Sequence, residues 1–278
     1  MKVGLLTAPF GRESLDVVIT FAAEAGFDAL EVTATPGSQH IDPSRVSSDE
    51  AKRIAEGVRS KGLEISSLAC YMNMTDPDPS KRKQVVDHLI ATIDTAAATG
   101  VDVVCAMAGM PVPGKDKMKT IEEDVREVYP PILRHAEEKG IKIALENWYA
   151  TNIQNLAHWE RIFEVVPSKN FGLNFDPSHL LWQGIDYLYA VERFADRIFH
   201  THAKDCEIKE HTLRRLGNQA SGWWRYVIPG FGKIHWGEYT AALRANGYNG
   251  VMSIEHEDGA LGREEGFMKG LQHLRQFA

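Results

Sequence analysis

The stretch KGIKIALEN, residues 139–147, decides the fold because its pattern recurs: a glycine follows a helix-like segment and an apolar strand-like run comes next. A glycine in this place supplies the left-handed residue that ends a helix, and the lysine before it suits the negative end of the helix dipole. The same order recurs around four other glycines: Gly26, Gly62, Gly100 and Gly247. The first four of these five glycines are 36, 38 and 40 residues apart, which is the length of one βα unit.

Working outward from this repeat, eight strand-like segments alternate with eight helix-like segments. The expected strands are residues 3–7, 29–33, 64–70, 103–108, 142–147, 172–176, 197–204 and 250–257. The expected helices are residues 14–25, 47–60, 79–99, 119–139, 155–165, 186–194, 236–245 and 262–276. Strict alternation is typical of α/β proteins with a parallel sheet, and eight units that close in one pass make a (β/α)8 TIM barrel. An open doubly wound sheet is the alternative, but the turn after the first strand, APFGR at residues 8–12, lacks the GxGxxG pattern.

The composition limits the function classes. With 44% hydrophobic and 25% charged residues, the 278-residue chain is typical of globular proteins. We expect a single TIM-barrel domain over residues 1–278, with an elaborated loop at about 205–235 after the seventh strand. The net charge of −7 argues against nucleic acid and anionic membrane partners. Three scattered cysteines, no signal-like segment and no long apolar run lead us to expect a soluble, cytoplasmic protein.

Acidic and imidazole side chains stand at the ends of four consecutive expected strands, where the chemistry of this fold is located. These residues are Glu146, Asp176, His202 and Glu255. Three anions facing one mouth would repel each other, and a divalent cation would remove the repulsion. Three carboxylates and one imidazole favour Mn²⁺, with Mg²⁺, Co²⁺ or Zn²⁺ as alternatives. One such residue alone is more often a rim residue or half of a salt bridge, for example with Lys204 or Arg225, but four aligned residues predict a metal site.

Two further features surround this predicted site. His200 lies two residues before His202 and points to the same side of the strand, so we expect a hydrogen-bonded interior histidine one layer below the metal. The run WWRY, residues 223–226, lies in a loop flanked by glycine and proline. Its two tryptophans and its arginine indicate a lid or an interface, and tryptophan suits the faces of sugars.

Taken together, these motifs resemble a known family. The motifs are Glu146, DPSH at residues 176–179, HTHAKD at 200–205, PGFGKIHW at 229–236 and SIEHED at 253–258. The pattern resembles the xylose-isomerase-like TIM barrel superfamily, and more narrowly its sugar phosphate isomerase/epimerase branch, which includes the ketose 3-epimerases. The resemblance covers essentially the whole chain, from AGFDALEV at residues 25–32 to the last helix.

The resemblance implies that the four aligned residues hold one divalent metal and that Glu146 and Glu255 flank the substrate as an acid/base pair. A metal that chelates a carbonyl and a neighbouring hydroxyl acidifies the adjacent C–H. One carboxylate would remove that proton to leave an enediolate on the metal, and reprotonation would epimerise or isomerise the sugar. We expect four residues around the mouth to bind the sugar or keto-sugar substrate: His179, Arg225, Trp148 and Lys204. The resemblance also implies a homo-oligomer, a dimer or tetramer, with a partner subunit as the alternative.

Several alternatives stay open. Asn152 and Ile208 stand where the ketose 3-epimerases carry a glutamate and an arginine, which argues against a free ketose as substrate. The long loop also resembles relatives that act on 3-keto-glycosides, including catalytic subunits of C-glycoside deglycosidases, so a lyase with the same proton abstraction is the first alternative. Apurinic endonucleases share the barrel, but they need more metals and ligands than this one cluster offers. A barrel that only binds a ligand is the last alternative.

Overall fold

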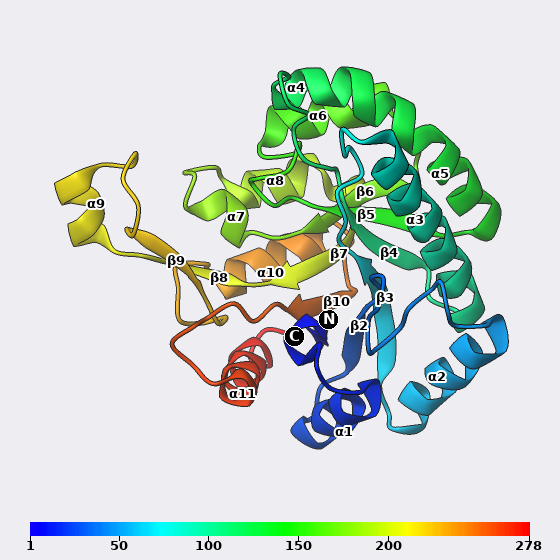
Figure 1. The fold of residues 1–278 in the computed structure, drawn as a ribbon. Helices are drawn as coiled ribbons and strands as arrows, with labels where there is room; N and C mark the ends of the chain where they lie inside the picture. Colours follow the sequence, from blue (N-terminus) through cyan, green and yellow to red (C-terminus); the bar gives the residue numbers. More distant parts are fainter.

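Eight parallel strands form a closed barrel in the computed structural model, which describes residues 1–278 (Figure 1). The bounds of the barrel strands are β1 Lys2–Leu6, β2 Ala29–Thr33, β3 Glu64–Cys70, β4 Val103–Met107, β5 Lys142–Glu146, β6 Phe171–Phe175, β7 Ile198–Ala203 and β10 Val251–Ile254. Around the barrel they follow the order β1-β10-β7-β6-β5-β4-β3-β2. All neighbours are parallel, and the pairing of β1 with β10 closes the ring. The predicted (β/α)8 TIM barrel is therefore confirmed.

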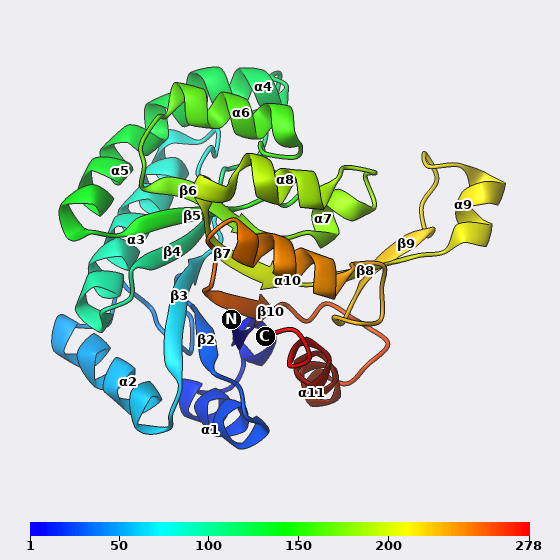
Figure 2. The same cartoon turned by 180° about the vertical axis from the view of Figure 1, so that it is seen from behind.

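Helices surround the barrel on its outside (Figure 2). The main helices are α1 Leu15–Ala25, α2 Ser48–Ser60, α3 Pro79–Thr99, α5 Arg126–Lys139, α6 Leu156–Val165, α8 Tyr187–Arg193, α10 Trp236–Ala245 and α11 Arg263–Leu274. Shorter turns complete the set: α4 Lys117–Thr120, the π-helical turn Ile121–Val125, α7 Ser178–Leu181 and the 3-10 turns Ala8–Phe10 and Ala195–Arg197. The segment expected as one helix at 119–139 is thus divided into α4, the π-helical turn and α5. None of the helices is both long enough and apolar enough to cross a membrane.

Three of the five glycines of the repeat cap their helices as the sequence predicts, and Gly62 and Gly247 follow the cap residue of theirs. Gly26, Gly100 and Gly140 cap α1, α3 and α5 with φ values of 86°, 76° and 71°. Each N–H donates to carbonyl groups of the last helical turn, which satisfies oxygens that the helix leaves free. The next strand starts within a few residues of each glycine, so the repeat sets the spacing of strands around the barrel.

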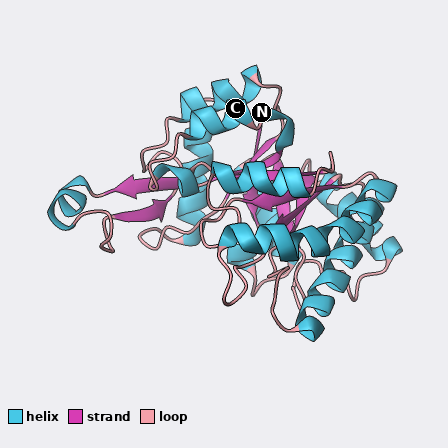
Figure 3. Cartoon of the chain, turned by 90° about the horizontal axis from the view of Figure 1, so that it is seen from above, coloured by secondary structure: helices cyan, strands magenta, loops and turns pink.

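The segment after β7, where the sequence leads us to expect an elaborated loop at about 205–235, forms an arm. Strands β8 Asp205–Ile208 and β9 Trp224–Val227 pair in antiparallel fashion, and α9 Glu210–Leu216 lies between them. Figures 1 and 3 show this arm standing away from the ring of helices, with α9 at its tip. Because antiparallel strands pair without a crossover helix to a parallel neighbour, this ribbon adds no βα unit to the barrel.

The apolar core lies mainly between the barrel and its helices. One cluster of 59 buried hydrophobic residues fills that layer. The barrel interior has only a small apolar cluster of Val103, Cys105 and Ala144. Six further inward positions carry buried polar side chains: Glu31, Ser67, Asn174, His200, His202 and Ser253. The interior of this barrel therefore holds a polar network directly beneath the carboxyl ends of the strands.

Candidate metal centre and active site

The four residues predicted as metal ligands meet at the carboxyl end of the barrel. Glu146 is the last residue of β5, Asp176 directly follows β6, His202 lies in β7 and Glu255 directly follows β10. One ligand atom from each residue lies within 4.8 Å of those of the other three. Parallel strands end at one edge, so residues at equivalent heights converge although the chain separates them by many positions.

The atoms of this cluster fit a divalent cation. Asp176 Oδ2 and His202 Nδ1 are buried and have no hydrogen-bond partner. His202 Nδ1 lies 3.0 Å from Glu255 Oε2 and 3.6 Å from Glu146 Oε1, so its open side faces the carboxylates. A cation in this position would bind both atoms, which the protein leaves without a hydrogen bond of their own beside charged neighbours. Three carboxylates and a neutral imidazole are also a donor set that divalent metals accept.

Lys204 supplies a positive charge at the edge of the same cluster. Its ammonium group is buried and lies 2.6 Å from Glu255 Oε2, 3.2 Å from Glu257 Oε2 and 3.3 Å from Asp176 Oδ2. Burial by itself would lower the pKa of Lys204, but these carboxylates raise it well above its ordinary value. The residue predicted to bind substrate is therefore a charged lysine that balances the acidic cluster.

His179 connects the cluster to the arm. The side chain comes from α7 and is fully buried. Its Nε2 lies 3.3 Å from Glu146 Oε1, and its Nδ1 lies 2.6 Å from the hydroxyl group of Tyr226 in β9. The imidazole is thus held between an expected metal ligand and an aromatic residue of the arm.

A cavity of about 550 Å³ opens above these groups. Its walls are Tyr71, Met107, Glu146, Trp148, Tyr149, His179, Lys204, Tyr226, Glu255 and Glu257. Acidic groups and a lysine line its floor while aromatic rings line its sides, a combination that suits a polyhydroxylated molecule with apolar ring faces. Among the residues predicted to bind substrate, His179, Trp148 and Lys204 belong to this wall.

Arg225 does not line the cavity. Alternate residues of a strand point to opposite faces, so Tyr226 faces the cavity whereas Arg225 points away from it. The Arg225 guanidinium pairs with Glu207 at 2.5 Å and with Asp258 at 2.6 Å. In this geometry the residue predicted to bind substrate instead ties the arm to the loop after β10.

Glu31 is a buried residue of the site that the sequence reasoning missed. It lies in β2, and its Oε2 is 3.0 Å from His202 Nε2, while the hydroxyl group of Tyr71 donates to its Oε1 at 2.6 Å. Burial would raise the pKa of Glu31, but the neighbouring His202 and His200 and the bonds from His202 and Tyr71 lower it to about 2. The signal in the sequence is the motif AGFDALEV, where a glutamate interrupts an apolar strand.

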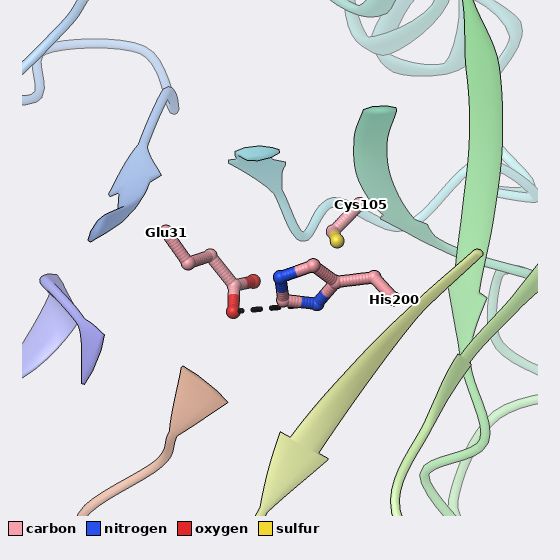
Figure 4. A group of neighbouring side chains, drawn as sticks. All are labelled: Glu31, Cys105 and His200. Atoms are coloured by element: carbon pink, nitrogen blue, oxygen red, sulfur yellow. Dashed lines mark ion pairs between the residues drawn. The ribbon is translucent and has the colours of Figure 1, made fainter. Parts of the chain in front are cut away.

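Glu31, Cys105 and His200 form a second group of side chains that approach one another inside the barrel (Figure 4). His200 Nδ1 and Nε2 already lie 2.9 Å from Asn174 Oδ1 and 3.1 Å from Ser66 Oγ. Burial lowers the pKa of His200 to about 4. Because its ring nitrogens have partners, His200 is a hydrogen-bonded interior histidine, located two residues before the expected ligand His202.

This chain is similar to several known proteins. A family model described as "Xylose isomerase-like TIM barrel" matches residues 19–277. The uncharacterized protein YfiH of Bacillus subtilis (strain 168) is 28% identical, and the alignment covers 99% of each chain. The inosose dehydratase of Bacillus thuringiensis (strain Al Hakam) is 30% identical over 51% of this chain and 50% of that enzyme. This chain therefore matches only about half the length of that dehydratase.

Two solved structures share the fold over nearly the full length. The IOLI protein with a bound zinc atom has a TM-score of 0.77 at 20% identity and covers 100% of this chain and 99% of that one. L-ribulose 3-epimerase has a TM-score of 0.75 at 19% identity and covers 99% of this chain and 92% of that one. At sequence identities this low, the similarity to these two structures shows the fold alone.

Proposed function

Because this chain belongs to the xylose isomerase-like TIM barrel family, we propose that it is a divalent-metal-dependent sugar isomerase or epimerase. The observation that carries the proposal is the pair of carboxylates, Glu146 and Glu255, which line one cavity and lie within 4.8 Å of ligand atoms of the buried Asp176 and His202. The substrate class is a small sugar or keto-sugar. A divalent cation bound by these four residues would polarise a carbonyl oxygen of the substrate and acidify the neighbouring C–H.

The two carboxylates are suited to move that proton. Around the barrel, β6 and β7 separate β5 from β10, so Glu146 and Glu255 approach the cavity from different sides. Burial by itself would raise both pKa values. For Glu146 the contacts with His179 and His202 outweigh burial, and for Glu255 the charges of Lys204 and His202 do, so both pKa values are lowered. Both groups are therefore ionised at neutral pH, and either can accept the proton from carbon. To return a proton to the opposite face of the substrate, the other carboxylate must first take up a proton from solvent and then donate it.

The neighbouring residues of the wall orient the substrate. Lys204 and His179 offer nitrogen atoms at the floor of the cavity, 3.3 Å apart, where they can bind hydroxyl or carbonyl oxygens. Trp148, Tyr149 and Tyr226 supply the aromatic side of the cavity. Holding the reacting C–H between two positioned carboxylates is what general acid–base catalysis requires, and each positioned group contributes typically about 10²–10⁴-fold.

Hydrogen exchange in D₂O tests the proposal. With a panel of free ketoses and 3-keto-glycosides, the Mn²⁺-loaded protein should introduce deuterium at the carbon next to the carbonyl, observed by NMR. Glu146→Gln and Glu255→Gln should each abolish the exchange, whereas Glu265→Gln on the exposed face of α11 should retain it. Exchange that survives both cavity substitutions would contradict the two-carboxylate proposal.

A lyase is the second candidate function. The curated relative named inosose dehydratase favours it, since a dehydratase also begins by removing a proton next to a carbonyl. The same NMR experiment separates the two reactions. Epimerisation or isomerisation keeps every carbon and oxygen atom of the substrate, whereas elimination produces an unsaturated product and releases water or another leaving group.

A further inference from the structure

Glu31 is a fully buried carboxylate on the opposite wall of the barrel from the predicted ligand His202. Two strands, β1 and β10, separate β2 from β7 in the ring, so these side chains meet only across the interior. Burying a carboxylate away from water costs free energy unless charged or hydrogen-bonding groups surround it. Here both of its oxygens are occupied, Oε2 by His202 Nε2 at 3.0 Å and Oε1 by the hydroxyl group of Tyr71 at 2.6 Å.

This contact determines which nitrogen of His202 can bind a metal. An ionised carboxylate only accepts hydrogen bonds, so the imidazole must carry a proton on Nε2 to satisfy Glu31. A neutral imidazole then has its lone pair on Nδ1. That is the nitrogen that faces Glu146 and Glu255 and lacks a hydrogen-bond partner.

Further hydrogen bonds hold the carboxylate of Glu31 itself in place. The Tyr71 hydroxyl group donates to Glu31 Oε1 and accepts from Asn174 Nδ2 at 2.8 Å. Asn174 Oδ1 in turn lies 2.9 Å from His200 Nδ1. The chain of contacts therefore runs from the lower barrel interior up to the predicted ligand, and it leaves Glu31 little freedom to rotate away.

We propose that Glu31 is a positioning residue of the metal centre: its carboxylate holds His202 in the Nε2–H form and presents Nδ1 to a divalent cation. The inference rests on the proposed metal site and adds a residue that does not touch the cation. Hydrogen bonds to the distal nitrogen of a ligating histidine set its tautomer and ring orientation, and losing such a partner typically weakens metal affinity about 10–100-fold.

Metal affinity is the direct test, because a residue that only fills the interior would not change it selectively. The dissociation constants of Zn²⁺ and Mn²⁺ are measured by chelator competition on metal-stripped wild-type protein, Glu31→Ala and Glu31→Gln. Glu31→Ala should bind about 10–100-fold more weakly than wild type. Glu31→Gln keeps an acceptor oxygen of nearly the same shape and should recover part of that loss, and it remains informative where the alanine variant does not fold.

Glu64→Gln is the matched control, because Glu64 begins β3 at the other end of the barrel and pairs with Lys2. It should bind both metals as the wild type does. The absorption spectrum of bound Co²⁺ is a second readout, since a reoriented His202 would change the ligand field in the Glu31 variants but not in Glu64→Gln.

The outcomes separate the inference from the function on which it rests. Wild-type protein that binds no divalent metal would overturn the proposed function and this inference together. Wild-type protein that binds metal, with affinities and Co²⁺ spectra unchanged in both Glu31 variants, would overturn the role of Glu31 alone.

Discussion

Lys204 shows how a single residue balances a site built from acids. Its ammonium group is 1% exposed and lies within 3.3 Å of oxygens from Asp176, Glu255 and Glu257. A lysine buried with hydrogen-bonded anions keeps its charge, whereas acids without that cation would remain uncompensated. At the scale of residues, Lys204 thus neutralises part of the negative charge of the acidic cluster, and a bound cation would neutralise more of it.

The first prediction concerns this compensation. Lys204→Met should destabilise the metal-free protein by about 3–5 kcal/mol, because breaking a buried charge pair leaves its partners unpaired. Urea unfolding measured with chelator and with saturating Mn²⁺ checks it. The loss of unfolding free energy should be smaller with Mn²⁺, since the cation neutralises the charge of the same carboxylates. An equal loss in both conditions would contradict the interpretation.

The second prediction concerns pH. Burial by itself would lower the pKa of His202, but the charges of Glu31 and Glu255 and the contact with Glu146 raise it well above its ordinary value. Below that raised pKa the metal-free imidazole carries two protons, and a metal on Nδ1 must displace one of them. Metal affinity should therefore rise about tenfold per pH unit between about pH 6 and 8.

Calorimetry checks this linkage. Titrations of Mn²⁺ in two buffers with different ionisation enthalpies should reveal the release of about one proton per metal at neutral pH. An affinity that does not change with pH would show that His202 is already neutral in the metal-free protein.

At the scale of elements, the two parts of the arm differ: strand β9 contributes to the cavity, whereas helix α9 at the tip does not. Tyr226 in β9 contacts His179 at the cavity, and Arg225 ties the same strand to Asp258. By contrast, α9 at the tip has no buried residue. The alternation of a β-strand explains why neighbouring residues of the arm serve such different purposes.

The third prediction follows from this division. Replacing residues 210–221 by a short Gly-Ser turn should change the thermal midpoint by no more than about 2 °C, because surface segments without buried contacts contribute little to stability. Differential scanning calorimetry of the shortened chain checks it, and Mn²⁺ affinity should stay that of the full chain. A much lower midpoint would show that α9 stabilises the barrel.

At the scale of the whole molecule, the candidate metal site joins strands that are distant in sequence. Its four expected ligands belong to β5, β6, β7 and β10, which is half of the ring, and the closing pair of β1 and β10 lies next to it. The two chain ends lie side by side at this closure in Figures 1 and 2. A ligand that binds only the folded ring shifts the unfolding equilibrium of the entire barrel.

The fourth prediction is a concentration-dependent stabilisation by metal. At a free Mn²⁺ concentration about 100 times the dissociation constant, binding adds about 2.7 kcal/mol, and the thermal midpoint should rise by about 5–10 °C. Thermal scans from chelator to excess Mn²⁺ measure it, with Asp176→Asn as the variant that should lose the response. A midpoint that does not depend on Mn²⁺ would argue against a site formed by the native barrel.

Much of the fold of this protein can be predicted from the local pattern of its sequence. The capping glycines and the alternating segments predict the barrel, because helix ends and strand periods are set by nearest neighbours along the chain. The same pattern predicts that Glu146, Asp176, His202 and Glu255 converge, since parallel strands deliver their ends to one edge. Local pattern did not predict two details: the helix expected at 119–139 is divided by a π-helical turn, and the loop after β7 contains an antiparallel pair of strands.

The sequence by itself therefore determined the fold and the four acidic and imidazole groups at the carboxyl end of the barrel. Only the tertiary structure decided that Glu31 reaches His202, a residue 171 positions away, and that Arg225 turns from the cavity toward Asp258. The physical reason is that closure of the barrel determines which side chains meet across its interior. The alternation of side chains along a strand determines which of them point inward. Neither relation is expressed in the residues next to Glu31 or Arg225.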